Sequence, residues 1–227
     1  MREHFHGELA VLSEGMIEMP RLVGSAVARG TTALLDADLG LAESVIAADE
    51  RVDALQVEIE ERSFDLIARQ QPVATDLRVV ITGLRMTADL ERMGDLARHV
   101  AKLARMRYPR SAIPAELRGT IVEMGQVAER VVAKTGSVIA TRDLQLAAEL
   151  ETDDDAMDQL HRTLFAVLLS PDWEHGVESA IDVTLCGRYY ERFADHAVSV
   201  ARRVVYLVTG ERPVLTSADH ATGLRPA

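Results

Sequence analysis

Pairs of acidic residues spaced four positions apart occur at two corresponding places in this chain. Glu91 and Asp95 form one pair, and Glu191 and Asp195 form another 100 positions later. Residues four apart share one face of an α-helix, so each pair can present two carboxylates to the same point. Oxygen ligands suit hard cations such as Mg²⁺, Mn²⁺ and Ca²⁺, and carboxylates also bridge ferric iron. The spacing therefore indicates candidate metal sites.

A second acidic pair precedes each of these, on the helix that the sequence pattern predicts just upstream. If the two helices of each half are antiparallel neighbours, four carboxylates come within reach of a common point. Without a cation this arrangement is unfavourable, because the like charges repel one another and each loses hydration. The candidate metal-ligating residues are Asp49, Asp53, Glu91, Asp95, Asp154, Asp158, Glu191 and Asp195.

Two alternatives to this assignment stay open. The chain holds 36 acidic residues, so an isolated pair has no weight, and the acids could form a charged structural face paired with arginines. The run of three aspartates at 153–155 also leaves the second-half register open, with Glu151 and Asp155 as the competing pair. The fourfold recurrence favours metal binding over the charge-paired face. The candidate arginine partners are Arg78, Arg85, Arg92, Arg188 and Arg192.

The residues around these pairs are repeated as well. Glu91, Arg92, Asp95 and Ala97 recur identically 100 positions later, and apolar residues recur around them. A repeat of this length means that one structural unit is used twice. Apolar residues at steps of three and four predict helices throughout the chain. The expected helices cover residues 9–35, 41–66, 86–104, 115–141, 144–169 and 176–209.

We therefore predict an all-α fold of two tandem three-helix bundles, with six long antiparallel helices related by pseudo-twofold symmetry. The best boundary is the stretch 109–114, which has a proline at each end. The predicted organisation is a first repeat at 1–108, a linker at 109–114 and a second repeat at 115–210. The polar tail at 211–227 is predicted to be disordered.

The composition excludes several classes of function. A net charge of −11 argues against unassisted binding to nucleic acid, which needs a basic surface. The single cysteine, Cys186, excludes an intrachain disulfide, and the N-terminus does not resemble a signal peptide, so we expect a cytoplasmic protein. No apolar run approaches the roughly 20 residues of a membrane span, so any membrane role must go through a partner. No nucleophile is set beside a base, so we expect no enzyme.

The repeated segments closely resemble the paired signatures of the PhoU family. The resemblance extends over nearly the whole chain, from Phe5 to Gly210. It is carried by Leu90-Glu91-Arg92-Met93-Gly94-Asp95, by Tyr190-Glu191-Arg192-Phe193-Ala194-Asp195-His196-Ala197, and by the stretch 72–78, which is similar to the family's entry into its third helix. The segment 172–176 and the Tyr108-Pro109 linker are similar to the actinobacterial, PhoY-type branch.

This resemblance implies a cytoplasmic regulator of phosphate homeostasis that restrains phosphate uptake and the phosphate-starvation response when phosphate is plentiful. It implies an adaptor between the ATPase subunit of the phosphate ABC transporter and a membrane sensor histidine kinase, and we expect a homodimer. The resemblance also implies that metal ions such as iron, zinc, manganese or magnesium bind the eight acids given above. The alternatives are a carboxylate-bridged di-metal enzyme and a metal-buffering helical bundle.

Overall fold

The computed structural model describes residues 2–211, and over these residues the chain forms helices and no strand. The first half contains α1 (Arg2–Asp36), α2 (Leu39–Ala48), α3 (Glu50–Gln70) and α4 (Ala74–Arg107). The second half contains a short 3₁₀ helix η1 (Ala115–Leu117), α5 (Arg118–Thr141), α6 (Leu144–Leu168) and α7 (Gly176–Thr209). The all-α prediction is confirmed, and most of the tail predicted to be disordered, residues 212–227, lies outside the described residues.

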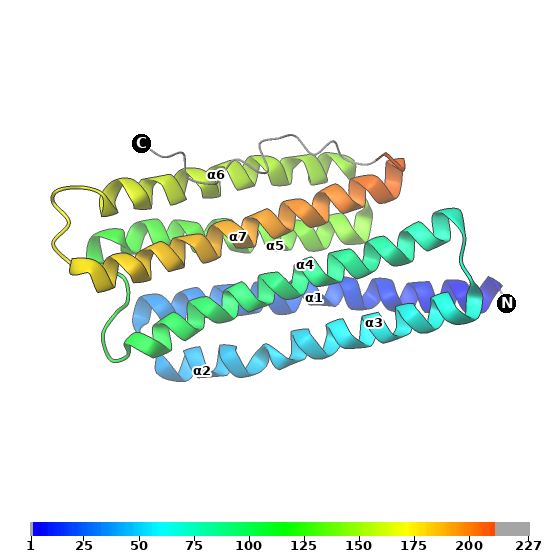
Figure 1. Cartoon of the computed structure of the whole chain (residues 1–227), viewed down its shortest axis with the longest axis horizontal. Helices are drawn as coiled ribbons and strands as arrows, with labels where there is room; N and C mark the ends of the chain where they lie inside the picture. Colours follow the sequence, from blue (N-terminus) through cyan, green and yellow to red (C-terminus); the bar gives the residue numbers. More distant parts are fainter. Residues whose placement is uncertain (1, 212–227) are drawn as a thin grey trace.

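The second of the six expected helices is interrupted at Asp49, where α2 ends and α3 begins. The Asp49 backbone keeps right-handed helical angles, with φ −61° and ψ −31°. The chain therefore continues in nearly the same direction, and α2 and α3 together take the place of one long helix (Figure 1). Apolar periodicity cannot reveal such an interruption, because the buried positions on both sides stay in step.

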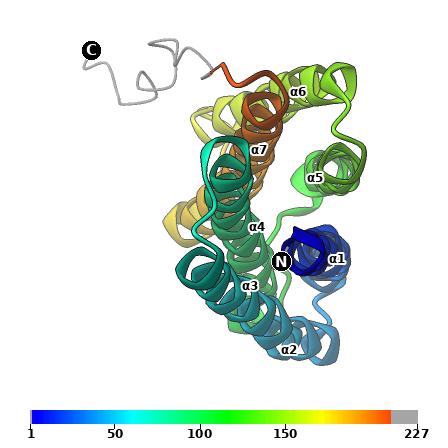
Figure 2. The same cartoon turned by 90° about the vertical axis from the view of Figure 1, so that its right-hand side faces the viewer.

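The two three-helix units join through a central layer. The helices α1, α4, α5 and α7 pack on one another, while α2 and α3 cover α1 and α4, and α6 covers α5 and α7. Figure 2 shows this arrangement along the long axis of the molecule. The first and third helix of each unit therefore meet their counterparts in the other unit, as expected for pseudo-twofold symmetry.

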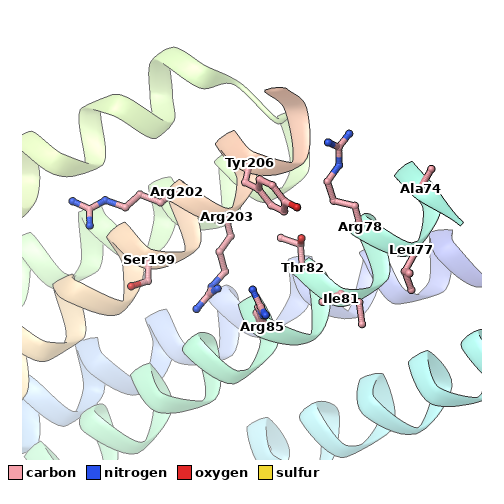
Figure 3. Close-up of a pocket in the computed structure, with 10 residues that line it drawn as sticks. All are labelled: Ala74, Leu77, Arg78, Ile81, Thr82, Arg85, Ser199, Arg202, Arg203 and Tyr206. Carbon is pink, nitrogen blue, oxygen red and sulfur yellow. The ribbon is translucent and has the colours of Figure 1, made fainter. Parts of the chain in front are cut away.

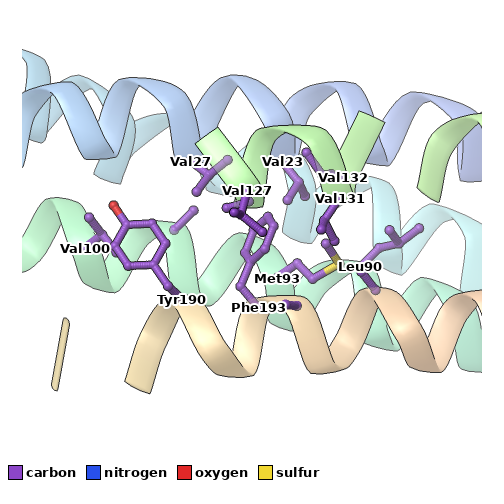
Figure 4. Close-up of a cluster of buried hydrophobic side chains, with 14 of the residues drawn as sticks. Val23, Val27, Leu90, Met93, Val100, Val127, Val131, Val132, Tyr190 and Phe193 are labelled. Carbon is purple, nitrogen blue, oxygen red and sulfur yellow. The ribbon is translucent and has the colours of Figure 1, made fainter. Parts of the chain in front are cut away.

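One continuous apolar core holds the two units together. Met93 and Phe193 occupy corresponding repeat positions and are both buried at the junction of the units (Figure 4). The hydroxyl of Tyr190 lies 2.7 Å from that of Thr31, and this hydrogen bond joins α7 to α1. Burial at these positions contributes the hydrophobic part of the stability, at about 1.5–3 kcal/mol for each large side chain. The repeat seen in the sequence is thus a repeat of core positions.

Candidate metal centres

The first acidic cluster comprises Asp49, Asp53, Glu91 and Asp95, and it lies where the break between α2 and α3 meets the middle of α4. Gly94 allows the close approach of these elements, because a Cβ atom there would lie 3.3 Å from Asp49 Oδ1. Asp49 is buried, with 4% of its surface exposed. The sequence therefore places the one fully buried acid of this cluster at the helix interruption, opposite a residue without a side chain.

The carboxylates of this first cluster repel one another. Burial is the largest cause that raises the pKa of Asp49, and the charges of Asp53 and Asp95 raise it further. Burial also raises the pKa of Glu91, followed by the charge of Asp95. Such mutual effects require the side chains to be close, so the structure brings the four predicted residues together.

An arginine that the sequence analysis did not select balances much of this charge. Arg98 forms ion pairs with Asp49 and with Asp95. The Arg98 guanidinium is the main influence that lowers the pKa of Asp49 against the effect of burial. The only sequence signal was the spacing of three between Asp95 and Arg98, which places both on one helix face. The pairing with Asp49 depends on the packing of α4 on α2 and α3.

The second acidic cluster comprises Asp154, Asp158, Glu191 and Asp195, on α6 and α7. Burial raises the pKa of Asp154 to about 7, and the charge of Asp195 is the next largest cause. Burial likewise raises the pKa of Glu191 to about 7, and Asp195 again follows. The pKa of Asp195 is raised by burial, against the opposing charges of Arg192 and Arg188.

This second cluster has no counterpart of Arg98. The corresponding position in the repeat is Val198, which is buried. Arg188 donates a hydrogen bond to Glu191, and Arg192 lies 3.9 Å from Asp195. Asp154 has no ion pair with a side chain of residues 7–211. Arg162, Arg188 and Arg192 each pair with an acid on their own helix, so the second cluster has no arginine that joins its two helices as Arg98 does in the first. The repeated signatures do not reveal this difference.

The structure also distinguishes the two registers of the second-half pair. Asp154 is half-buried and interacts electrostatically with Glu191 and Asp195, whereas Asp155 is exposed. Glu151 is exposed and accepts a hydrogen bond from Arg202 at 3.2 Å. The residues that face α7 at the acidic cluster are therefore Asp154 and Asp158.

The arginine partners proposed from the sequence divide into two groups. Arg92 donates a hydrogen bond of 2.9 Å to Asp95 and lies 3.6 Å from Glu91, so part of the charge-paired alternative is present. Arg188 and Arg192 contact the second cluster in the same way. Arg78 and Arg85 instead line a pocket at another part of the α4–α7 interface.

The donor chemistry of both clusters fits a hard cation. Buried carboxylate oxygens without a hydrogen-bond partner occur at Asp49, Asp154 and Glu191. Oxygen donors of this kind suit octahedral divalent ions. Among the side chains that the structure describes, those of residues 7–211, no three His, Cys, Asp or Glu are however arranged to hold a metal ion as they stand. Cation binding would need side-chain rotation, and in the first cluster it would also need Arg98 to release Asp49.

Imidazoles lie near both clusters without taking part in them. His99 stacks on Tyr189 with ring centroids 5.2 Å apart, and burial lowers the pKa of His99. His161 packs edge-on against Phe165, and burial lowers its pKa as well. Cys186 is fully buried, and burial raises the pKa of its thiol, so it is a core residue.

None of the helices within the described residues has the length and apolar composition needed to cross a bilayer.

Comparison with known proteins gives one consistent result. The PhoU domain model matches residues 16–104 and 121–204. A phosphate-specific transport system accessory protein, PhoU homolog 2 of Mycobacterium tuberculosis, is 50% identical over 213 residues, covering 94% of this chain and 100% of that protein. PhoU homolog 1 of Mycobacterium leprae is 49% identical, covering 94% of this chain and 96% of that protein.

Solved structures are similar over the same length. The crystal structure of PhoU from Pseudomonas aeruginosa has a TM-score of 0.82 and 29% sequence identity, and the match covers 91% of this chain and 100% of that one. The phosphate transport system regulatory protein PhoU from Streptococcus pneumoniae has a TM-score of 0.83 and 25% identity, with 93% and 100% covered.

Proposed function

The chain belongs to the PhoU family, and from this premise we propose that it regulates phosphate uptake as an accessory protein of a phosphate-specific transport system. The observation that carries the proposal is the sequence identity of 50% and 49% to two proteins named phosphate-specific transport system accessory proteins, over nearly their full length. The high coverage matters because the match extends over both three-helix units.

We further propose that the protein acts by contact and not by catalysis. It would be a cytoplasmic homodimer that links the ATPase subunit of the transporter to a membrane sensor histidine kinase and keeps the phosphate-starvation response off. The net charge of −11 supports a basic partner surface, because complementary charge speeds and orients association. The proposed organisation is a first repeat at 1–108, a linker at 109–114 and a second repeat at 115–210.

The test of this function compares a deletion strain with its complemented strains. Loss of the gene should leave phosphate uptake and a phosphate-starvation reporter active in phosphate-rich medium, and the wild-type gene should restore repression. Purified protein should also retain the transporter ATPase subunit in a pull-down at low ionic strength, with less retained at high ionic strength. Normal repression in the deletion strain would contradict the regulatory role, and turnover of a substrate by the pure protein would favour the enzyme alternative.

We propose that each acidic cluster holds a metal ion, with iron, zinc, manganese and magnesium as candidates. In the first half the ligands are Asp49, Asp53, Glu91 and Asp95; in the second half they are Asp154, Asp158, Glu191 and Asp195. A bound cation would replace mutual repulsion with attraction and change the local charge by two or three, which is enough to alter docking of a charged partner.

Elemental analysis of protein purified without a nickel column, then stripped and reloaded, tests this proposal. The double variant Glu191→Gln/Asp195→Asn should lose the metal of the second half and keep that of the first. The matched control is Glu151→Gln/Asp155→Asn, which removes the same charge from the competing register and should leave the metal content unchanged. Unchanged metal content in the first variant would mean that the cluster is only a charged face.

A further inference from the structure

A pocket of about 590 Å³ opens between the N-terminal part of α4 and the C-terminal part of α7. Within the described part of the chain its lining carries no acidic side chain, although the full sequence has 36 acids against 25 basic residues. Four of the lining residues are arginines, and the others are small, hydroxyl-bearing or apolar (Figure 3). The lining consists of Ala74, Leu77, Arg78, Ile81, Thr82, Arg85, Ser199, Arg202, Arg203 and Tyr206.

The arginines of this pocket differ in how far their charge is balanced. Arg203 donates a hydrogen bond of 2.7 Å to Asp89, and Arg202 donates one of 3.2 Å to Glu151 on α6. Arg78 and Arg85 have no ion pair with any residue that the structure describes. Because guanidinium groups stay protonated, two of the four positive charges in the pocket have no counter-charge among the residues that the structure describes.

The backbone and an aromatic ring hold Arg78 in position. Its guanidinium carbon lies 5.7 Å from the centre of the Tyr206 ring, within the range of a cation–π contact. A guanidinium nitrogen of Arg78 occupies the space that a Cβ atom would take at Gly210, where φ is +77°. The buried Nε of Arg78 has no hydrogen-bond acceptor. The group is thus positioned by packing while part of its donor capacity is unused.

The opposite end of the same helix pair provides an internal comparison. There, Arg107 of α4 forms ion pairs with Glu178 and with Asp182 of α7. These two acids correspond, at the 100-residue offset, to Arg78 and Thr82 of the pocket. The fold therefore neutralises its arginine at one end of the α4–α7 pair, whereas the equivalent positions at the other end carry an arginine and a neutral residue. An arginine without a counter-charge from the protein is favourable where a bound anion supplies the negative charge.

We propose that this pocket binds a small organic anion that carries phosphoryl groups, of the nucleotide type. Arg78 and Arg85 hold the phosphoryl oxygens, since the guanidinium fork matches phosphate geometry. The apolar side chains of Leu77 and Ile81 and the Tyr206 ring contact the organic part. The volume lies within the range of about 300–1,000 Å³ in which proteins hold small organic ligands, so orthophosphate alone would leave most of the pocket empty.

Calorimetric titration of the full chain tests the proposal, with EDTA-treated protein in buffer free of divalent ions, so that the acidic clusters do not contribute. The probes are ATP, pyrophosphate, orthophosphate and adenosine. ATP should bind most tightly and pyrophosphate more weakly, while orthophosphate and adenosine should bind at least about tenfold more weakly than ATP. Because the contact is with partly exposed charges, ATP binding should weaken as salt rises from about 50 to 300 mM.

Two variants and a matched control identify the site. Arg78→Gln and Arg85→Gln should each weaken ATP binding by about tenfold or more, as expected for the loss of a charged hydrogen-bond donor. Arg105→Gln removes the same charge from an exposed position of α4 outside the pocket and should change the affinity by less than about twofold. Thermal melts of the three variants without ligand provide the folding check, and Arg85, being exposed, should not affect folding.

The results that would overturn the proposal are specific. Absence of ATP binding would exclude the ligand class, and an equal loss in Arg105→Gln would show that binding follows net charge only. Equal affinity for orthophosphate and ATP would exclude an organic ligand. These outcomes are separate from the proposed regulatory function, which the deletion strain tests without reference to this pocket.

Discussion

Replacing Asp154 by Asn should make the metal-free protein more stable, and the gain should grow with pH. Burial and the charges of Asp195 and Asp158 raise the pKa of Asp154 from its ordinary 3.8 to about 7. Between these two pH values the unfolded chain has ionised Asp154 while the folded chain still holds its proton. Folding therefore takes up a proton, and stability is lost as pH rises through this window, after which the dependence levels off.

The size of the effect follows from the rise in pKa. One pH unit corresponds to about 1.4 kcal/mol, so the full rise would correspond to roughly 4 kcal/mol for a group shielded from water. Asp154 is only half-buried, and solvent screens such interactions, so we expect about half of this, ~2 kcal/mol, at pH 8. Between pH 5 and pH 8 the advantage of Asp154→Asn over the wild type should grow by about 1–1.5 kcal/mol.

Urea unfolding in EDTA at pH 5, 6, 7 and 8 measures this advantage directly. The difference between variant and wild type cancels the titration of the histidines, which both proteins share. Asp155→Asn is the matched control, because it removes the same charge from the exposed neighbouring position. Glu191→Gln should behave like Asp154→Asn, and the double variant should gain less than the sum, since the two acids titrate together. A gain that does not change with pH, or an equal gain in Asp155→Asn, would refute the reasoning.

Three further predictions concern the first cluster and the core. Arg98→Gln should lower the free energy of unfolding by about 3–5 kcal/mol in denaturant titrations, because it leaves the buried Asp49 charge without its partner, and acidic pH should recover part of the loss. Phe193→Ala should cost about 3–5 kcal/mol by the same measurement, since it opens a cavity where the two units meet; a cost under about 1 kcal/mol would contradict the shared core. Gly125→Ala should lower the melting temperature through a loss of about 1–3 kcal/mol, because its Cβ would lie 2.7 Å from Thr31 Cγ2; an unchanged melt would mean that α1 and α5 separate easily.

The sequence was sufficient for the fold class and for the pairing of equivalent core positions. A helical spacing relates Leu90, Met93 and Val100, which places them in one apolar stripe. These positions are buried because folding removes that stripe from water. The recurrence of that stripe 100 residues later predicted two equivalent units. Phe193 takes the repeat position of Met93, and both side chains are buried. Such patterns are local, so they can be read without knowing which helix lies opposite.

The sequence also predicted that the two acids of each pair lie on the same side of a helix, because residues four apart share a helix face. It did not determine the charge balance of the two clusters. Arg98 neutralises Asp49 across an interface between helices, and Val198 takes the corresponding place in the second half. Asp49 and Arg98 are 49 positions apart in the sequence, so whether they meet depends on how the helices pack. The sequence pattern does not encode the distance between them in space.

The pocket between α4 and α7 shows the same limit more clearly. In the sequence Arg78 and Arg85 were candidate partners for the acids, and nothing distinguished them from other charged residues on helix surfaces. Only the antiparallel packing of α4 on α7 places them beside Arg203 and Tyr206 and away from the acidic clusters (Figure 3). Local spacing thus determined which residues share a helix face, whereas tertiary packing decided which charges meet, because electrostatic interactions depend on distances in space that the order of residues does not fix.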